Sequence, residues 1–372
     1  MLPFSLFKSG NEGEKKFLAL NEMKTAKLRY SLIMGLLLLI AYLMYFLSGL
    51  AFGLIEENRS AIDNWKADTI LLSKDANASL NFSKLSLKDK SEIKAKQVEE
   101  LAEINTVVWI KKDPKESDKE KVAFFGLDKT SSLIPKVING RELRNKEEIL
   151  IDQSLAQKAN FKVGDTLTEA NSKEKFKIVG ITKKATFNVA PVIHLSLDDF
   201  QKLNQIPSSK NNLKVNAYVV KGKIESFNES KFQKLTSKKF IQKLPGYNAQ
   251  VLTFGFMIGF LILISAIIIG IFMYVLTIQK APIFGIMKAQ GIANKTIANA
   301  VISQTIILSF IGSSLGLLGT WLSSIVLPQA VPFQGNWVLY AVIFALMMLF
   351  AILGSLFSVI AIVRIDPLKS IG

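Results

Sequence analysis

The residue types that usually carry catalysis or bind metals are scarce in this chain. Its 372 residues contain no cysteine and a single histidine, His194. Without cysteine there is no disulfide, thiolate nucleophile or cysteine zinc site, and one histidine does not make a zinc centre. His194 lies in an apolar stretch, where we expect a structural role. No G-x-x-x-x-G-K-[ST] motif occurs, so the chain lacks the usual phosphate-binding loop for ATP. We expect neither an enzyme nor an intrinsic cofactor or metal.

A short polar segment, residues 279–296, is the best candidate for a contact with another protein. We expect it to form a short amphipathic helix whose apolar side chains project from a rim made by Lys280 and Lys288. Apolar anchors with a basic rim suit a groove on a protein partner. The residues that we assign to this contact are Ile283, Phe284, Gly285, Ile286, Met287, Lys288 and Gly291.

Four long apolar runs surround this segment and one large polar region. They cover residues 32–55, 250–278, 297–327 and 337–363. About 20 apolar residues span the hydrocarbon core of a bilayer as a helix, so each run predicts a transmembrane helix. The first run is too long for the apolar part of a cleaved signal peptide. The chain is therefore expected to be a membrane protein with four spans.

The distribution of Lys and Arg predicts which side of the membrane each connection faces. Residues 1–31, the segment 279–296 and the tail 364–372 are rich in Lys or Arg, whereas the short connection 328–336 has none. Short basic segments stay in the cytoplasm. We expect both termini inside the cell, 328–336 outside, and 56–249 as an extracytoplasmic domain of a bacterial plasma-membrane protein. Residues 14–30 predict an amphipathic helix on the inner leaflet.

The first run also holds a Gly49-x-x-x-Gly53 pair. Such a pair allows two helices to approach closely and suggests a dimer seam.

The domain at 56–249 has the pattern of a small α+β fold, because short β-branched runs alternate with helical stretches. Residues 56–66 should continue the first span as a helix. Strands are expected at 69–72, 105–110, 122–126, 148–151, 176–181, 192–195 and 215–220. Helices are expected at 87–101, 155–159, 197–203 and 226–239. The domain is basic, but without an aromatic–basic module we do not expect nucleic acid as a partner.

Several motifs of the chain resemble those of MacB/FtsX-like (type VII) ABC transporter permeases. The outer domain carries Ile-Asn-Gly-Arg-Glu-Leu at 138–143, Val-Gly-Asp-Thr-Leu at 163–167 and Phe-Lys-Ile-Val-Gly-Ile at 176–181, in the family's order. The segment 285–291 and the tail 364–369 resemble two further signatures. Ile283 stands where the family often has an acid, and Gln290 replaces an isoleucine of the motif. The resemblance implies a permease homodimer bound to two separate ABC ATPase subunits, which bind ATP and contact 279–296.

The segment 17–77 and Pro282-Ile-Phe-Gly look most similar to haem-efflux permeases of Gram-positive bacteria. This resemblance implies export of a hydrophobic toxic compound, haem above all, driven by force that the second span relays from the ATPase. Haem would enter from the lipid bilayer and lie between first spans. Haem iron accepts Met or Tyr as axial ligands. Met44 is our candidate ligand, and Tyr42, Tyr45 and Tyr247 are candidate neighbours.

Two alternatives remain open at this point. One is a permease for antimicrobial peptides, and the other is an FtsX-like transmitter that signals to a wall hydrolase.

Overall fold

The computed structural model describes residues 27–203, 214–328 and 331–363. The expected amphipathic helix at 14–30 lies outside the described residues except for 27–30, and the tail signature at 364–369 lies outside them entirely. The chain divides into two compact units. Among the described residues, one unit comprises 27–52, Thr253–Leu327 and 333–363; the other comprises the described parts of Gly53–Leu252 and Pro328–Pro332.

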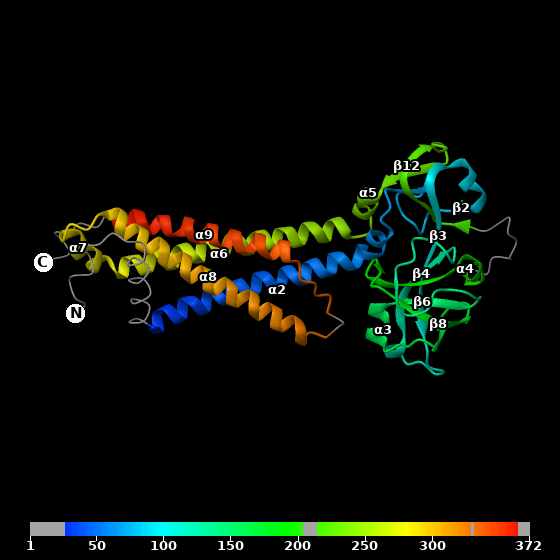
Figure 1. The fold of residues 1–372 in the computed structure, drawn as a ribbon, viewed down its shortest axis with the longest axis horizontal. Helices are drawn as coiled ribbons and strands as arrows, with labels where there is room; N and C mark the ends of the chain where they lie inside the picture. Colours follow the sequence, from blue (N-terminus) through cyan, green and yellow to red (C-terminus); the bar gives the residue numbers. More distant parts are fainter. Residues whose placement is uncertain (1–26, 204–213, 329–330, 364–372) are drawn as a thin grey trace. The chain divides into compact units, whose positions relative to one another are not determined.

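Four helices are long and apolar enough to cross a membrane, as the sequence predicts. The helices are α2 (Lys27–Trp65), α3 (Gln153–Ala159), α4 (Leu197–Leu203), α5 (Ser237–Gln242), α6 (Tyr247–Gln279), α7 (Ala281–Ala289), α8 (Asn294–Val326) and α9 (Trp337–Val363), drawn in Figure 1. The four candidate spans lie in α2, α6, α8 and α9.

The first unit is a helical bundle in which one buried apolar cluster joins five helices. Ile33 of α2, Met273 of α6, Phe284 of α7, Val301 of α8 and Ala351 of α9 all belong to one buried cluster. All five helices therefore share a core, which fixes the position of the short helix α7 against α6 and α8.

Glycines on α8 bring it close to α2. A Cβ built on Gly316 would lie 2.6 Å from the Ala41 Cβ, and one built on Gly312 would lie 2.8 Å from the Leu37 Cβ. Small residues at such positions allow the backbones of membrane helices to approach. Gly354 of α9 faces Gly270 of α6 in the same way, with a built Cβ 2.9 Å from the Gly270 Cα. These contacts determine which face of each apolar helix points inward.

The second unit is an α+β domain built on a mixed sheet. Nine of its 11 described strands follow the order β13-β1-β12-β3-β4-β10-β6-β8-β5, and β7 and β9 complete the sheet beside this path. The strands are β1 (Thr69–Ser73), β2 (Leu85–Ser86), β3 (Lys94–Trp109), β4 (Glu120–Leu127), β5 (Val137–Gly140), β6 (Glu148–Asp152), β7 (Thr166–Glu169), β8 (Lys175–Thr182), β9 (Thr186–Phe187), β10 (Ala190–Ser196), β11 (Lys214–Val215), β12 (Ala217–Ser226) and β13 (Phe232–Thr236). β2 and β11 form a separate pair.

The long strand β3 joins the two halves of this sheet. Up to Leu101 it pairs with β12, and from Ala102 to Val108 it pairs with β4. Buried clusters cover both halves, one around Trp65 and Phe125 and another around Phe124 and Phe176. The expected architecture, four apolar helices with one α+β domain between the first and the second, is confirmed.

Two helix predictions in this domain are wrong. Residues 87–101 form a short 3-10 helix, η2 (Leu87–Glu92), followed by the start of β3. The Lys- and Glu-rich sequence favours a helix by propensity, but pairing with β12 outweighs that preference. Residues 226–239 contain β13 and only the beginning of α5, because the Thr236 hydroxyl caps α5 by accepting from the Lys239 amide.

Candidate functional site

The helix α7 forms in the predicted coupling segment, with a proline in its first turn. Proline fits there because the first backbone N–H groups of a helix have no intrahelical partner. The chain leaves the helix through Gly291, whose φ of +85° favours glycine. Ile283 and Ile286 are 56% and 47% exposed. They form an apolar pair on the surface of the helix that a partner protein could contact.

Two residues expected on the surface of this segment are buried instead. Phe284 is 8% exposed and packs with Ile297 and Val301 in the bundle core. Lys280 is 7% exposed, and its ammonium group donates to the Gln304 Oε1 at 3.2 Å. Phe284 is buried because helical periodicity places its side chain on the face of α7 opposite to that of Ile283 and Ile286. Gly285 is buried, and Met287 and Lys288 are half-buried.

Met44 and Tyr45 lie inside the helical bundle. Met44 is 2% exposed, and the Ser265 hydroxyl of α6 contacts its sulfur at 3.3 Å. Tyr45 is fully buried, and its hydroxyl lies 2.7 Å from the Ser313 Oγ of α8. Tyr42 is half-buried, with its hydroxyl 3.0 Å from the Ser323 Oγ. The structure therefore brings these three predicted residues together on α2, where each contacts a serine of a neighbouring helix.

The large exposed side chains of α2 are aliphatic. Leu32, Leu39 and Leu43 are exposed, whereas Met44 points into the bundle. Gly49 is buried as well, because a Cβ built on it would lie 2.5 Å from the Phe333 ring in the same unit. The expectation that Gly49 forms a seam with a second copy is therefore wrong, since its close partner belongs to the same chain.

Tyr247 lies in the second unit rather than with the other three predicted residues. It is 7% exposed in the core cluster around Trp65, and its hydroxyl accepts a hydrogen bond from Arg59 at 3.4 Å. The Asn58 side chain donates to the Gln250 Oε1 at 2.8 Å. Within this unit, the end of α2 and the beginning of α6 are thus linked by two side-chain hydrogen bonds. The sequence did not reveal these pairs, whose members lie almost 200 residues apart.

The end of α2 is also bound to a turn of the sheet in the second unit. The Ser60 hydroxyl lies 2.7 Å from the Thr186 Oγ1, and the Val189 amide donates to the Glu57 carbonyl at 3.2 Å. The Asn64 side chain donates to the Lys184 carbonyl at 2.8 Å. A displacement of this end of α2 would therefore move the 184–189 segment of the domain with it.

His194 occupies a buried position in β10. Its ring is 1% exposed and meets the edge of Phe125 with centroids 6.1 Å apart. Burial lowers the pKa of His194 to about 3. A neutral, buried imidazole next to a phenyl ring fits the structural role that we expect for it. Among the described residues, no group of three or more His, Asp or Glu is placed to hold a metal ion.

Comparison with known proteins shows which proteins this chain is similar to. Residues 255–367 match the model of the FtsX-like permease C-terminal domain. A protein of Staphylococcus haemolyticus (strain JCSC1435), named as hemin transport system permease HrtB, is 28% identical over 357 residues. That alignment covers 95% of this chain and 99% of the relative. A protein of the same name from Staphylococcus epidermidis (strain ATCC 12228) is 27% identical over 364 residues, with the same coverage.

Two solved domains show a more limited similarity. The extracellular domain of the ABC-type transporter YknZ from Gram-positive bacteria matches 43% of this chain and 84% of its own length, with 14% identity and a TM-score of 0.30. The periplasmic region of MacB from Actinobacillus actinomycetemcomitans matches 50% of this chain and 96% of its own length, with 13% identity and a TM-score of 0.33.

The family match covers α7, α8, α9 and most of α6. The four apolar helices and this match together indicate a multi-pass membrane protein. This chain carries an FtsX-like permease domain over residues 255–367 and is similar to HrtB permeases over almost its whole length.

Proposed function

We propose that this chain is the permease subunit of an ABC exporter whose ATP hydrolysis is performed by a separate ATPase subunit. The observation that carries the proposal is α7, which lies inside the FtsX-like match and exposes Ile283 and Ile286. The chain itself has no phosphate-binding loop. The exporter then consists of two permeases and two ATPases, with both termini and α7 in the cytoplasm and the α+β domain outside.

Haem is the proposed substrate, because the similar staphylococcal proteins are named as hemin transport permeases. It enters from the bilayer and lies between the first spans of the dimer. Met44 is the proposed axial ligand, since a thioether can ligate haem iron. In the described conformation the Met44 sulfur contacts Ser265 inside the bundle. Ligation therefore requires a state in which α6 has moved away from α2.

Force transmission is the proposed mechanism of export. α6 has 33 residues, about 50 Å at 1.5 Å per residue, and it runs without a break from the segment before α7 into the α+β domain. There its first turns hold the end of α2 through Asn58–Gln250 and Arg59–Tyr247. A movement of α7 caused by the ATPase would travel along α6, shift this junction and separate α6 from Met44.

The ATPase contact is tested by replacing both exposed isoleucines of α7 with aspartate. In I283D/I286D we expect co-purification of the ATPase subunit to be lost, because charge is introduced into an apolar contact. The melting temperature should stay unchanged, since both side chains are exposed. I138D, at an isoleucine that is 50% exposed in the α+β domain, is the matched control. Full ATPase binding by I283D/I286D would refute the assignment of α7.

The ligand is tested with two buried methionines of the same cluster. Met44 and Met347 are both 2% exposed, and each sulfur contacts a serine hydroxyl. M44A should shift or weaken the Soret band of bound haem, whereas M347A should leave the band as it is. A band that is unchanged in M44A would remove Met44 as the ligand and leave haem as the substrate.

A further inference from the structure

A pocket of about 480 Å³ opens in the α+β domain at a break in the sheet. It lies along β3 between Leu101, the last residue that pairs with β12, and Val108, where the pairing with β7 begins. Between these two points β3 pairs with β4 on one edge only, as far as the described residues show. Its volume falls within the roughly 300–1,000 Å³ typical of small-molecule sites.

The free edge of β3 offers backbone groups to a ligand. The Glu103 amide donates to the Asn216 Oδ1 at 2.7 Å, and the Val107 carbonyl accepts from the Ala170 amide at 3.0 Å. Alternate residues of a strand direct their backbone groups to the same edge. Asn105 therefore directs its N–H and C=O to this edge too, and neither has a partner among the described residues. An extended peptide can pair with such an edge.

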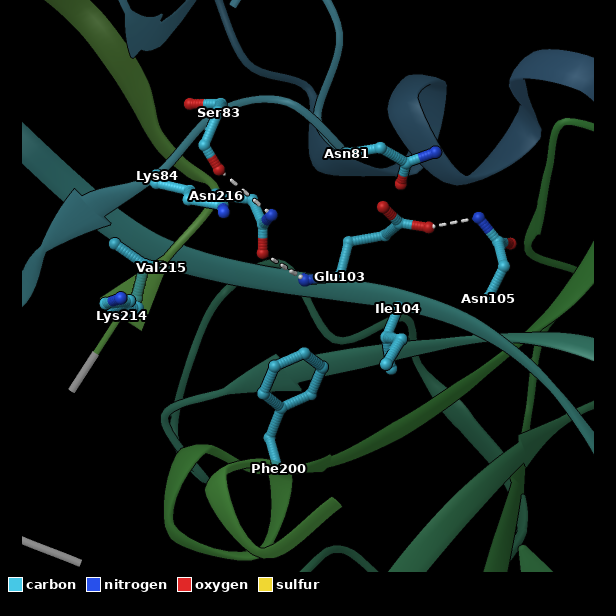
Figure 2. A pocket seen from close by; sticks show the side chains of 10 residues that line it. All are labelled: Asn81, Ser83, Lys84, Glu103, Ile104, Asn105, Phe200, Lys214, Val215 and Asn216. Atoms are coloured by element: carbon cyan, nitrogen blue, oxygen red, sulfur yellow. Dashed lines mark hydrogen bonds between the residues drawn. The ribbon is translucent and has the colours of Figure 1, made fainter. Parts of the chain in front are cut away.

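A buried carboxylate faces the pocket from the same strand. The Glu103 side chain points away from β3 toward the side of the pocket that holds Asn81 and Asn105 (Figure 2). The residue is 5% exposed. Its Oε1 accepts from the Asn105 side chain at 2.6 Å, but its Oε2 is buried without a hydrogen-bond partner. Burying an unsatisfied carboxylate oxygen is costly, so this atom is poised for a donor from a ligand.

Two lysines lie on the other side of the pocket. Lys84 and Lys214 line it next to Val215, and both are exposed (Figure 2). Neither makes an ion pair with a described residue. The pocket thus combines a carboxylate, a free strand edge and two ammonium groups. A ligand that satisfies all three carries a positive group, a peptide-like backbone and a negative group.

We propose that this pocket binds a short peptide of two or three small residues with free ends. The peptide's ammonium group donates to Glu103, its backbone pairs with Asn105 at the free edge of β3, and its carboxylate faces Lys84 and Lys214. Asn216 is a positioning residue, because its side chain donates to the Leu80 and Ser83 carbonyls while it accepts from the Glu103 amide. It holds the 80–83 loop beside β3. This inference rests on neither haem nor an ATPase.

The test uses the full-length chain in nanodiscs, titrated with trialanine in a calorimeter. We expect saturable binding with one peptide per chain. N-acetyl-trialanine should bind about tenfold to a hundredfold more weakly, the effect typical of a hydrogen bond to a charged group. The E103Q substitution should weaken the binding of trialanine by the same factor. It should not weaken the binding of the acetylated peptide further. K84A/K214A should remove the preference for trialanine over its C-terminal amide.

E100Q is the matched control, because Glu100 lies on the same strand outside the pocket and pairs with Lys90. It should bind trialanine like the wild type. Equal affinity for trialanine and its acetylated form would overturn the proposal, and so would full affinity in E103Q or the absence of saturable binding. The comparison of capped and free peptides on the wild type needs no variant, so it decides the question even where a substitution impairs folding. The titration contains no ATPase or haem, so its failure leaves the proposed function untouched.

Discussion

Glu103 should make the stability of the α+β domain depend on pH in a direction opposite to that of a salt-bridged carboxylate. Burial raises the pKa of Glu103 from 4.5 to about 7. The folded domain therefore binds a proton more tightly than the unfolded chain does. The contribution of Glu103 to stability is fully present below pH 4.5 and is lost as the pH rises to about 7.

The size of this effect follows from the pKa difference. One pKa unit corresponds to about 1.4 kcal/mol, so a rise of about 2.5 units gives a total of about 3 kcal/mol. Most of it should be lost between pH 5 and pH 8. Glutamine does not ionise, so E103Q lacks this loss. The other titratable groups that line the pocket are Lys84 and Lys214.

The assay is thermal unfolding of the full-length chain at pH 5 and pH 8, without peptide. For a domain of this size, the melting temperature of E103Q relative to wild type should rise by roughly 5 to 10 °C on going from pH 5 to pH 8. E100Q should show no such change, because Glu100 is paired with Lys90 outside the pocket. Parallel curves for wild type and E103Q would refute the claim that the Glu103 carboxylate is buried without sufficient partners.

Two further predictions concern helix contacts. Gly316→Ala should destabilise the bundle by about 1–3 kcal/mol, because the new methyl group meets the Ala41 Cβ; Gly35→Ala has open space and should stabilise α2 by up to about 1 kcal/mol. Melting of both variants in the same detergent checks the pair, and equal effects would contradict the packing argument. A double-mutant cycle of Asn58→Ala and Gln250→Ala should give a coupling energy of about 1 kcal/mol in thermal unfolding. Additive effects would show that this hydrogen bond does not hold α2 to α6.

The sequence was sufficient to predict the helical spans, because runs of uninterrupted apolar residues have few other stable structures in a membrane. It could not predict which face of α2 points inward, because that helix is apolar on nearly every side. The inward face is decided by Gly312, Gly316 and Ser313 of α8, which meet Leu37, Ala41 and Tyr45. Met44 was therefore correctly placed in the first span, but its contact with Ser265 was not foreseen.

The start of β3 was misread for a similar reason. Residues 94–100 are rich in Lys and Glu, which favour a helix in isolation, yet they pair along β12. The side chains of Glu103 and Asn105 lie on the same face of this strand. An acidic residue within a β-branched stretch was therefore a signal in the sequence for the pocket. What the sequence could not provide was the break in the sheet beside them, because β12 and β7 are distant in the chain.

The most direct test of the central claim is a haem titration of the chain assembled with its ATPase in nanodiscs, read by the Soret band and by ATP hydrolysis. We predict saturable haem binding and haem-stimulated hydrolysis in the wild type. In I283D/I286D, which we expect not to assemble with the ATPase, the stimulation should be lost. An absence of saturable binding together with hydrolysis that ignores haem would contradict the proposal of a haem exporter.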